Sequence, residues 1–127
     1  MRRVQRLTRR SEFEHTRTHG VRAGDRLFGV VAARSDQDTT RFGLAVSKRV
    51  GRAVVRNRIK RRIRAALDGM PFSEGWNVVV SARPAAAGAD FSDIAESLRK
   101  LSSRLKLLRL EGQAGTTEPP RSATTAR

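Results

Sequence analysis

The stretch from residue 41 to residue 67, RFGLAVSKRVGRAVVRNRIKRRIRAAL, constrains the fold more than any other part of the chain. Its beginning alternates between apolar and small or polar side chains, which predicts a strand over residues 41–47. After Gly51 the apolar spacing becomes that of a helix, with a stripe formed by Val55, Ile59, Ile63, Ala66 and Leu67. The run WNVVVSA at residues 76–82 is typical of a buried strand. Together the three segments predict a strand, a crossover helix and a second strand.

Two more strands are expected before this unit. Residues 27–33 are apolar and rich in β-formers, and residues 21–24 predict a short edge strand. The polar loop SDQDTT then leads into the strand at residues 41–47. Because this loop has the length of a hairpin connection, we expect the strands on either side of it to pair antiparallel.

Two more helices are expected, one at each end of the fold. Ser11 and Glu14 have the spacing of a capping box, and Gly20 is a plausible terminator, so a helix is predicted over residues 11–19. Asp90 is expected to cap the last helix. The core stripe of that helix is predicted to contain Phe91, Ile94, Leu98, Leu101, Leu105 and Leu108.

The two ends of the chain differ from its middle in composition. Residues 1–10 contain five Arg and only Val4 and Leu7 as apolar anchors, which predicts a basic arm that orders on binding. Residues 111–127 contain the breaker pair Pro119-Pro120 and no bulky apolar residue, which predicts a disordered tail. One folded domain is therefore expected over residues 11–110.

Positive charge is concentrated in the first half of the chain. Of the net charge of +15, residues 1–67 carry +14, from nineteen basic and five acidic side chains. Nine Lys or Arg occur in the seventeen residues from Lys48 to Arg64, and no acidic residue lies between Thr39 and Leu67. An ordinary solvated face mixes both signs, so this composition predicts a surface for a polyanion.

The helix within the 41–67 stretch directs most of these cations away from the apolar stripe. Asn57, Lys60, Arg61 and Arg64 fall opposite the stripe, while Arg56 and Arg58 flank it and Arg62 lies at its apolar edge, where it must snorkel to water. Structured RNA is the favoured ligand, and DNA, an anionic membrane and a merely solvated face stay open. The chain lacks a helix-turn-helix or zinc-finger pattern, and the stripe is built from Val, Ile and Ala, whereas interfacial helices favour Trp, Phe and Leu.

No arrangement of residues predicts a protein-borne active site. The sequence contains no nucleophile elbow, glycine-rich phosphate loop or cysteine, and Glu12 and Glu14 point apart on a helix. His15 and His19 lie one helical turn apart, and a surface role is favoured over zinc binding because no third ligand accompanies them. We therefore predict no catalytic residue and no metal ligand. The absence of cysteine, of an apolar membrane span and of a signal-peptide region predicts a cytoplasmic protein.

The segment AVSKRVGRAVVRNRIKRRIR resembles the defining segment of the bacterial ribonuclease P protein subunit. The resemblance rests on Ser-Lys-Arg at residues 47–49, the turn at Gly51, Arg-Asn-Arg at residues 56–58 and the spacing to Lys60. It extends more loosely from Leu7 to Leu108. It implies a single-domain α+β two-layer sandwich of order αβββαβα, with a four-stranded sheet and a left-handed βαβ crossover, which departs from the general right-handed rule.

The resemblance also implies the function and the residues that carry it. The expected function is to bind the catalytic RNA of ribonuclease P and the 5′ leader of precursor tRNA, assisting endonucleolytic removal of the leader. The protein alone is expected to be inactive, with Mg²⁺ held by the RNA subunit, and no membrane or obligate protein partner is expected. The implied RNA-binding residues are Lys48, Arg49, Arg52, Arg56, Asn57, Arg58, Lys60, Arg61 and Arg64. The implied leader-binding cleft contains Phe13, Phe28 and Ser47.

Two questions stay open at this stage. Phe13 and Phe28 either stack on unpaired bases or belong to the core, and Arg17 and Val31 stand where other members of the family often carry an aromatic residue. The rival functions are a ribosomal or RNA-chaperone protein, an architectural DNA binder and a nuclease that acts alone. Activity of the chain without RNA and co-sedimentation with ribosomal subunits separate these rivals.

Overall fold

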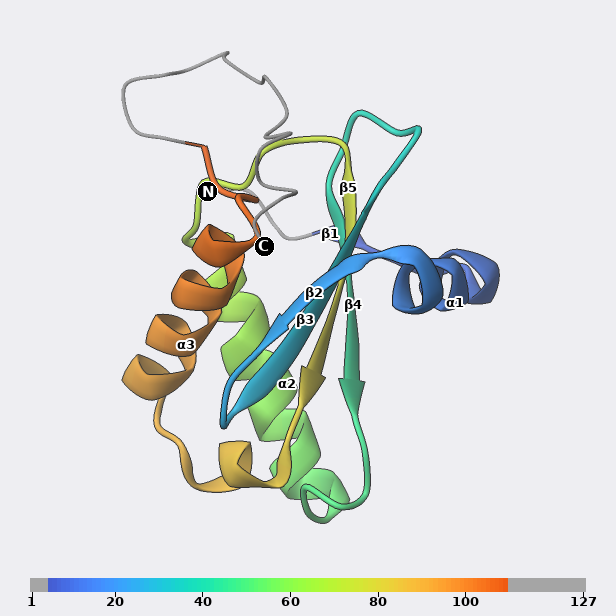
Figure 1. Ribbon diagram of the computed structural model, residues 1–127. Coiled ribbons are helices and arrows are strands. Elements are labelled where there is room, and N and C mark those ends of the chain that lie inside the picture. The colour runs from blue at the N-terminus through green and yellow to red at the C-terminus, as the bar shows by residue number, and fades with distance from the viewer. Residues whose placement is uncertain (1–4, 110–127) are drawn as a thin grey trace.

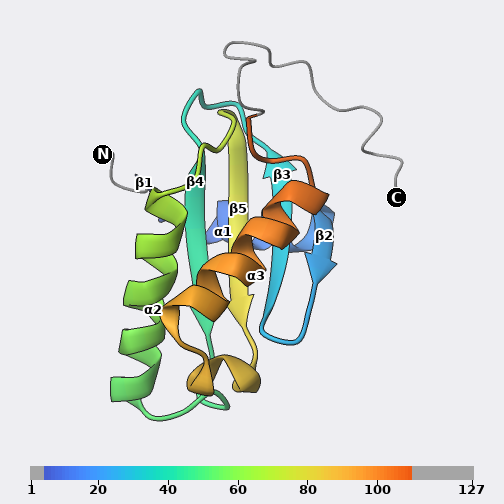
Figure 2. The same ribbon diagram turned by 90° about the vertical axis from the view of Figure 1, so that its left-hand side faces the viewer.

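The structure is a computed structural model that describes residues 5–109 (Figure 1). A mixed sheet carries two helices on one face and one helix on the other, as Figures 1 and 2 both show. The elements are β1 (Gln5–Arg6), α1 (Arg10–His19), β2 (Val21–Gly24), β3 (Phe28–Arg34), β4 (Arg41–Val46), α2 (Ala53–Asp68), β5 (Trp76–Ala82), the 3₁₀ helix η1 (Pro84–Gly88) and α3 (Phe91–Arg104). The α+β class and the order αβββαβα are confirmed, with β1 added before α1. The expected two layers become three, because α1 lies on the sheet face opposite α2 and α3.

The sheet has five strands in the order β1-β4-β5-β3-β2, not the predicted four. The extra strand comes from residues that we expected to belong to a basic arm. Gln5 and Arg6 pair in parallel with the start of β4, and the N–H of Leu7 donates to the carbonyl of Phe42 at 2.9 Å. Leu7 is only 7% exposed, so burial of this one side chain fixes the segment along an otherwise open strand edge. Residues 1–4 of the predicted arm and the predicted tail lie outside the described residues, while Arg10, the last residue of the predicted arm, begins α1.

The predicted hairpin between β3 and β4 is wrong, because β5 lies between these two strands. β5 pairs antiparallel with β3 and parallel with β4, and α2 connects the parallel pair as predicted. The segment from Asn77 to Val80 is buried on both faces of the sheet. An apolar strand of this kind buries the most surface at the centre of a sheet. The free energy gained by that burial outweighs the tendency of β3 and β4, which a short loop connects, to pair with each other.

The main core lies between the sheet and the pair α2 and α3. β3 contributes Phe28, Val30 and Ala32, which alternate with less buried residues. The helices contribute fully buried side chains at Ile59, Ile63, Ile94, Leu98 and Leu101. The predicted stripe of the last helix is only partly correct. Phe91 is 46% exposed, and the helix ends at Arg104, so that Leu107 and not Leu105 or Leu108 is fully buried.

The helix boundaries show which capping signals were correct. Asp90 caps α3 as predicted, since its carboxylate accepts the N–H of Asp93 at 2.9 Å. The capping box at Ser11 is wrong, because α1 begins one residue earlier, after Arg9, and has no side-chain cap. α1 ends before Gly20 as expected.

Candidate nucleic-acid interface

We call Lys48, Arg49, Arg52, Arg56, Asn57, Arg58, Lys60, Arg61 and Arg64 the basic surface. These residues occupy the turn after β4 and α2, where Asn57, Lys60, Arg61 and Arg64 lie on the side away from Ile59 and Ile63 and Arg56 and Arg58 flank the buried stripe. Asn57 and Arg61 are exposed, and Arg56, Arg58, Lys60 and Arg64 are partly exposed. The structure therefore brings all nine predicted RNA-binding residues onto one continuous segment.

The turn before α2 holds its cations outward because its middle is anchored. Val50 is 6% exposed, while Lys48 and Arg49 on its N-terminal side are exposed. Gly51 has φ of +155°, and a Cβ there would lie 3.0 Å from the side chain of Val55. Glycine tolerates this backbone conformation and this approach, so the tight entry into α2 depends on it.

The cations of the basic surface have no protein partner within residues 5–109. None of their side chains takes part in an ion pair or a side-chain hydrogen bond in that part of the chain. α2 also lacks an acidic residue in its first turn and a side-chain cap at Arg52. Cations near a helix N-terminus oppose the helix dipole, so an external polyanion would relieve an unfavourable arrangement.

Arg62 lies at the edge of the apolar stripe as predicted, but its guanidinium meets a backbone carbonyl in place of the predicted extension into water. Its guanidinium turns toward η1 and donates from Nη1 to the carbonyl oxygen of Ala89 at 3.0 Å. Arg62 therefore helps to attach the end of η1 to α2, and we do not count it in the basic surface.

A cavity of about 290 Å³ connects the basic surface to α1. Arg6, Thr8, Phe13, Lys60 and Arg64 line it, and no acidic residue does. Burial lowers the pKa of Arg64, and the nearby charge of Arg6 lowers it further. The sequence did not single out Arg6, because the strand that places it beside α2 consists of two residues only.

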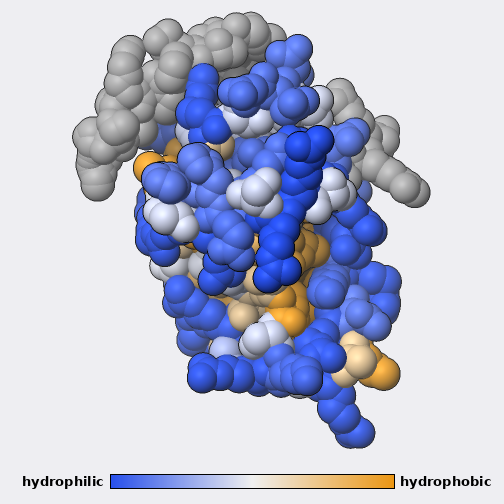
Figure 3. All heavy atoms as spheres, turned by 90° about the vertical axis from the view of Figure 1, so that its right-hand side faces the viewer, coloured by the Kyte–Doolittle hydropathy of each residue, from blue (hydrophilic) through white to orange (hydrophobic). Residues whose placement is uncertain are grey.

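A separate groove of about 370 Å³ lies on the α1 side of the sheet. Its charged residues are Arg17 on α1, Arg22 on β2 and Arg83 after β5. Arg22 donates from Nη2 to the carbonyl of Arg17 at 2.6 Å, which fixes one guanidinium at the rim. A Cβ on Gly24 would lie 2.7 Å from Nη2 of Arg83, so the glycine gives this guanidinium room on the sheet. Figure 3 shows this face, on which hydrophilic side chains surround a small apolar strip.

The structure does not bring the three predicted cleft residues together. Phe13 is half-buried on α1 and lines the cavity next to Lys60 and Arg64, not the groove of the three arginines. Phe28 is fully buried on the opposite face, in the core with α2 and α3, so the expectation that it lines a cleft is wrong. The alternation of β3 turns Phe28 to the helix side together with Val30. Ser47 is exposed, and its hydroxyl oxygen accepts the N–H of Arg49 at 3.3 Å.

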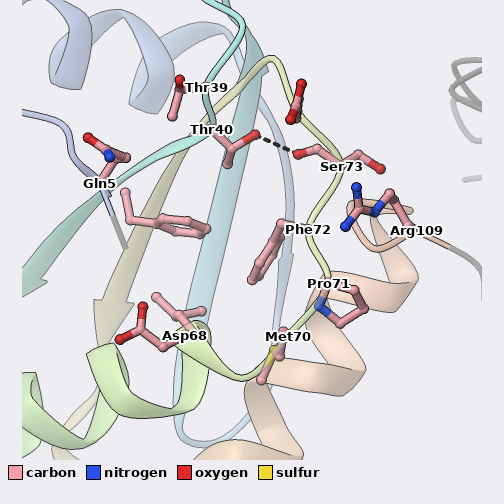
Figure 4. Close-up of a pocket in the computed structure, with 12 residues that line it drawn as sticks. Gln5, Thr39, Thr40, Asp68, Met70, Pro71, Phe72, Ser73 and Arg109 are labelled. Carbon is pink, nitrogen blue, oxygen red and sulfur yellow. Dashed lines mark hydrogen bonds between the residues drawn. The ribbon is translucent and has the colours of Figure 1, made fainter. Parts of the chain in front are cut away.

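A third cavity, of about 360 Å³, has a different character (Figure 4). It lies at the C-terminal end of α2, where the hydroxyl of Thr40 donates to the carbonyl of Ser73 at 2.6 Å. Asp68 and Glu74 line it, and Arg109 is its single basic residue among those described. This cavity therefore does not extend the basic surface.

Possible metal ligands are sparse in the described part of the chain. Within residues 5–109, no group of three or more His, Cys, Asp or Glu side chains could hold a metal ion. His15 and His19 stack with their ring centroids 4.5 Å apart on the exposed side of α1. No helix of residues 5–109 is both long enough and apolar enough to cross a membrane.

The fold and the basic surface define a small α+β protein with a surface for a polyanion, and comparison with known proteins identifies the family. The family model described as Ribonuclease P matches residues 1–106. The ribonuclease P protein component of Exiguobacterium sibiricum is 36% identical over 107 residues, which cover 82% of this chain and 92% of that protein. The corresponding protein of Pseudarthrobacter chlorophenolicus is 36% identical over 124 residues, which cover 89% of this chain and 91% of that protein.

Solved structures agree with the sequence comparison. The RNase P protein of Staphylococcus aureus superposes with a TM-score of 0.76 at 28% identity, covering 84% of this chain and 99% of that one. The RNase P protein of Thermotoga maritima gives a TM-score of 0.67 at 26% identity, covering 76% and 93%. The chain belongs to the ribonuclease P protein family. Its function is that of a protein subunit of ribonuclease P in tRNA processing, as the sequence resemblance indicated.

Proposed function

We propose that this chain binds the catalytic RNA of ribonuclease P through the basic surface and the 5′ leader of precursor tRNA through the residues beside α1. The RNA subunit performs the phosphodiester hydrolysis in this proposal. The observation that carries it is the basic surface itself, whose cations have no acidic partner within residues 5–109. Neutralising the phosphates of two RNAs allows them to approach each other at lower salt.

The leader contact is proposed for Phe13, Ser47 and the three arginines of the groove. Phe13 offers a partly exposed ring next to Lys60 and Arg64, which suits an unpaired base with its phosphate. Arg17 supplies positive charge at a position where other members of the family often carry an aromatic residue, and Arg83 adds a second charge in the same groove. The leader is then held more through its phosphates than through its bases, and its affinity should depend strongly on salt.

Magnesium belongs to the RNA subunit in this proposal. The positive field of the basic surface disfavours a divalent cation, and residues 5–109 offer no group of three acidic or His ligands. We also expect the protein to act in the cytoplasm, and we expect the β4-α2-β5 crossover to be left-handed, as the resemblance implies.

Reconstitution with the catalytic RNA tests the proposal. The protein with the RNA should cleave a precursor carrying a leader at lower Mg²⁺ than the RNA alone, and the protein alone should not cleave. Cleavage by the protein alone would indicate a nuclease that acts by itself. Co-sedimentation with ribosomal subunits, without any effect on precursor cleavage, would favour a ribosomal role.

The variant Phe13→Ala tests the leader contact within the assembled holoenzyme. Loss of one stacked base should weaken precursor binding by about 1 to 3 kcal/mol and leave binding of leaderless mature tRNA unchanged. The melting temperature of the variant should be measured in parallel. A uniform loss for both tRNAs with a lowered melting temperature would mean that Phe13 only attaches α1 to the sheet.

A further inference from the structure

Helix α1 has little apolar surface with which to hold its place on the sheet. Its sequence, RSEFEHTRTH, contains a single apolar side chain, Phe13, which lies over Gly43. Thr16 is fully buried, but its hydroxyl is used within the helix, where it donates to the carbonyl of Glu12 at 2.8 Å. Beside these two residues, a polar contact joins α1 to the sheet.

That polar contact joins α1 to β4, next to a buried polar residue of β5. Arg41 of β4 donates from Nη2 to Oε2 of Glu12 at 3.1 Å, and both side chains are mostly buried, with 19% and 27% exposed. Asn77 of β5 is the register partner of Arg41 and is 7% exposed. Alternation along paired strands places Arg41 and Asn77 side by side on the face that α1 covers.

Each of the three side chains keeps one buried polar atom without a hydrogen-bond partner in the described part of the chain. These atoms are Oε1 of Glu12, Nε of Arg41 and Oδ1 of Asn77. Leaving a buried polar atom unpaired is costly, and three such atoms on an ion pair and its neighbour across the strands are unusual for a native protein. Their chemistry is complementary, since they comprise one N–H donor and two acceptors.

We propose that Glu12, Arg41 and Asn77 bind one ordered water molecule and together form a polar anchor that sets the position of α1 on the sheet. The water accepts from Nε of Arg41 and donates to Oε1 of Glu12 and to Oδ1 of Asn77. Three hydrogen bonds are typical for a buried water. The three residues are positioning residues, because they act through α1 and not by touching RNA.

The anchor matters for RNA because α1 carries Phe13 and Arg17. A shift of the helix moves both side chains relative to Lys60 and Arg83, which lie on other elements. This consequence rests on the proposed leader contact. Small displacements of groups that must meet a ligand together weaken binding, so the anchor contributes to leader affinity without contacting the leader.

Two variants of the same helix test the anchor, because only one of them is expected to weaken precursor binding. Glu12→Ala and Glu14→Ala each remove one negative charge and introduce the same good helix former, but Glu14 is exposed. If charge alone mattered, both variants would bind RNA slightly more tightly. The anchor predicts that Glu12→Ala weakens precursor binding by about three- to tenfold, whereas Glu14→Ala does not weaken it.

Measurements that do not involve the leader separate the anchor from the proposed function. A crystal structure should show one water within hydrogen-bond distance of the three atoms. Amide hydrogen exchange in α1 should become faster in Glu12→Ala and not in Glu14→Ala. Affinity for the catalytic RNA should be unchanged in both variants.

The possible outcomes are distinct. Equal exchange rates in the two variants, or direct pairing of the three atoms without a water, would overturn the anchor. An equal loss of precursor and catalytic-RNA affinity in Glu12→Ala would also overturn it. If the wild-type protein does not distinguish precursor from mature tRNA, the proposed leader contact fails, while the exchange and crystallographic results still decide the anchor.

Discussion

The ring of Phe13 packs so closely over Gly43 that a Cβ at residue 43 would lie 2.6 Å from Cε2 of the ring. Glycine in β4 therefore lets the single apolar side chain of α1 approach the sheet backbone. The contact lies at the cavity that α1 shares with the basic surface, so fold and proposed function depend on the same close approach.

Gly43→Ala should displace Phe13 and loosen α1. We expect a loss of about 1 to 3 kcal/mol in unfolding free energy, as for other overpacked sites, measured by urea denaturation. The control is Gly88→Ala, since a Cβ there would meet nothing within 4 Å. Equal stability of the two variants would contradict the close packing of Phe13.

Arg58→Ala and Arg61→Ala should weaken binding to the catalytic RNA and lower its salt dependence. Each lost phosphate contact should reduce the slope of log affinity against log salt by up to about 0.9. Arg99→Ala on α3 removes the same charge from an exposed position outside the basic surface and serves as the control. A fall in affinity with an unchanged slope would show that these arginines pack and do not contact phosphate.

Asp25 should make stability depend on pH in the acid range. Burial disfavours its charged form, but hydrogen bonds from Ser97 and from the N–H groups of Phe28 and Leu27, with the charge of Arg83, outweigh burial and hold its pKa below the ordinary value of 3.8. The unfolded chain therefore binds more protons in this range, so the contribution of Asp25 is complete above about pH 5 and is lost as the pH falls through the lowered pKa.

The test of this linkage compares the wild type with Asp25→Asn. Unfolding free energy, followed by urea denaturation from pH 6 to pH 3, should fall less steeply in the variant. Ser97→Ala removes the 2.6 Å hydrogen bond to Oδ2 and should show an intermediate slope. Parallel curves for all three proteins would mean that other carboxylates dominate acid unfolding.

Sulfate or phosphate should stabilise the free protein by binding among the cations of the basic surface. The melting temperature should rise and saturate at millimolar anion, and chloride at equal ionic strength should have a smaller effect. Arg64→Ala should reduce the saturating part, because Arg64 and Arg6 line one cavity. A melting temperature that rises linearly with sulfate concentration, without saturating, would reflect general exclusion of the salt from the protein surface.

The local sequence was sufficient to predict helix α2 and to assign its buried and its exposed face. The spacing of Ile59, Ile63 and Leu67 places the buried stripe, and the cations between them, except Arg62 at its edge, must then face outward. The ligand class followed from the same stretch, because a run of cations without acidic neighbours needs a polyanion whatever the rest of the fold is. Asp90 correctly marked the start of α3 and Gly20 the end of α1, because such boundaries depend on a few consecutive residues.

Contacts between distant segments required the tertiary structure. Only the sheet shows that β5 separates β3 from β4, that Gln5 and Arg6 add a fifth strand, and that Phe28 points into the core. The same holds for Arg6 beside Arg64, and for Glu12 beside Arg41. Strand order and facing pairs depend on the total burial that a whole arrangement achieves, and alternation along one strand does not say which face meets the larger helical layer.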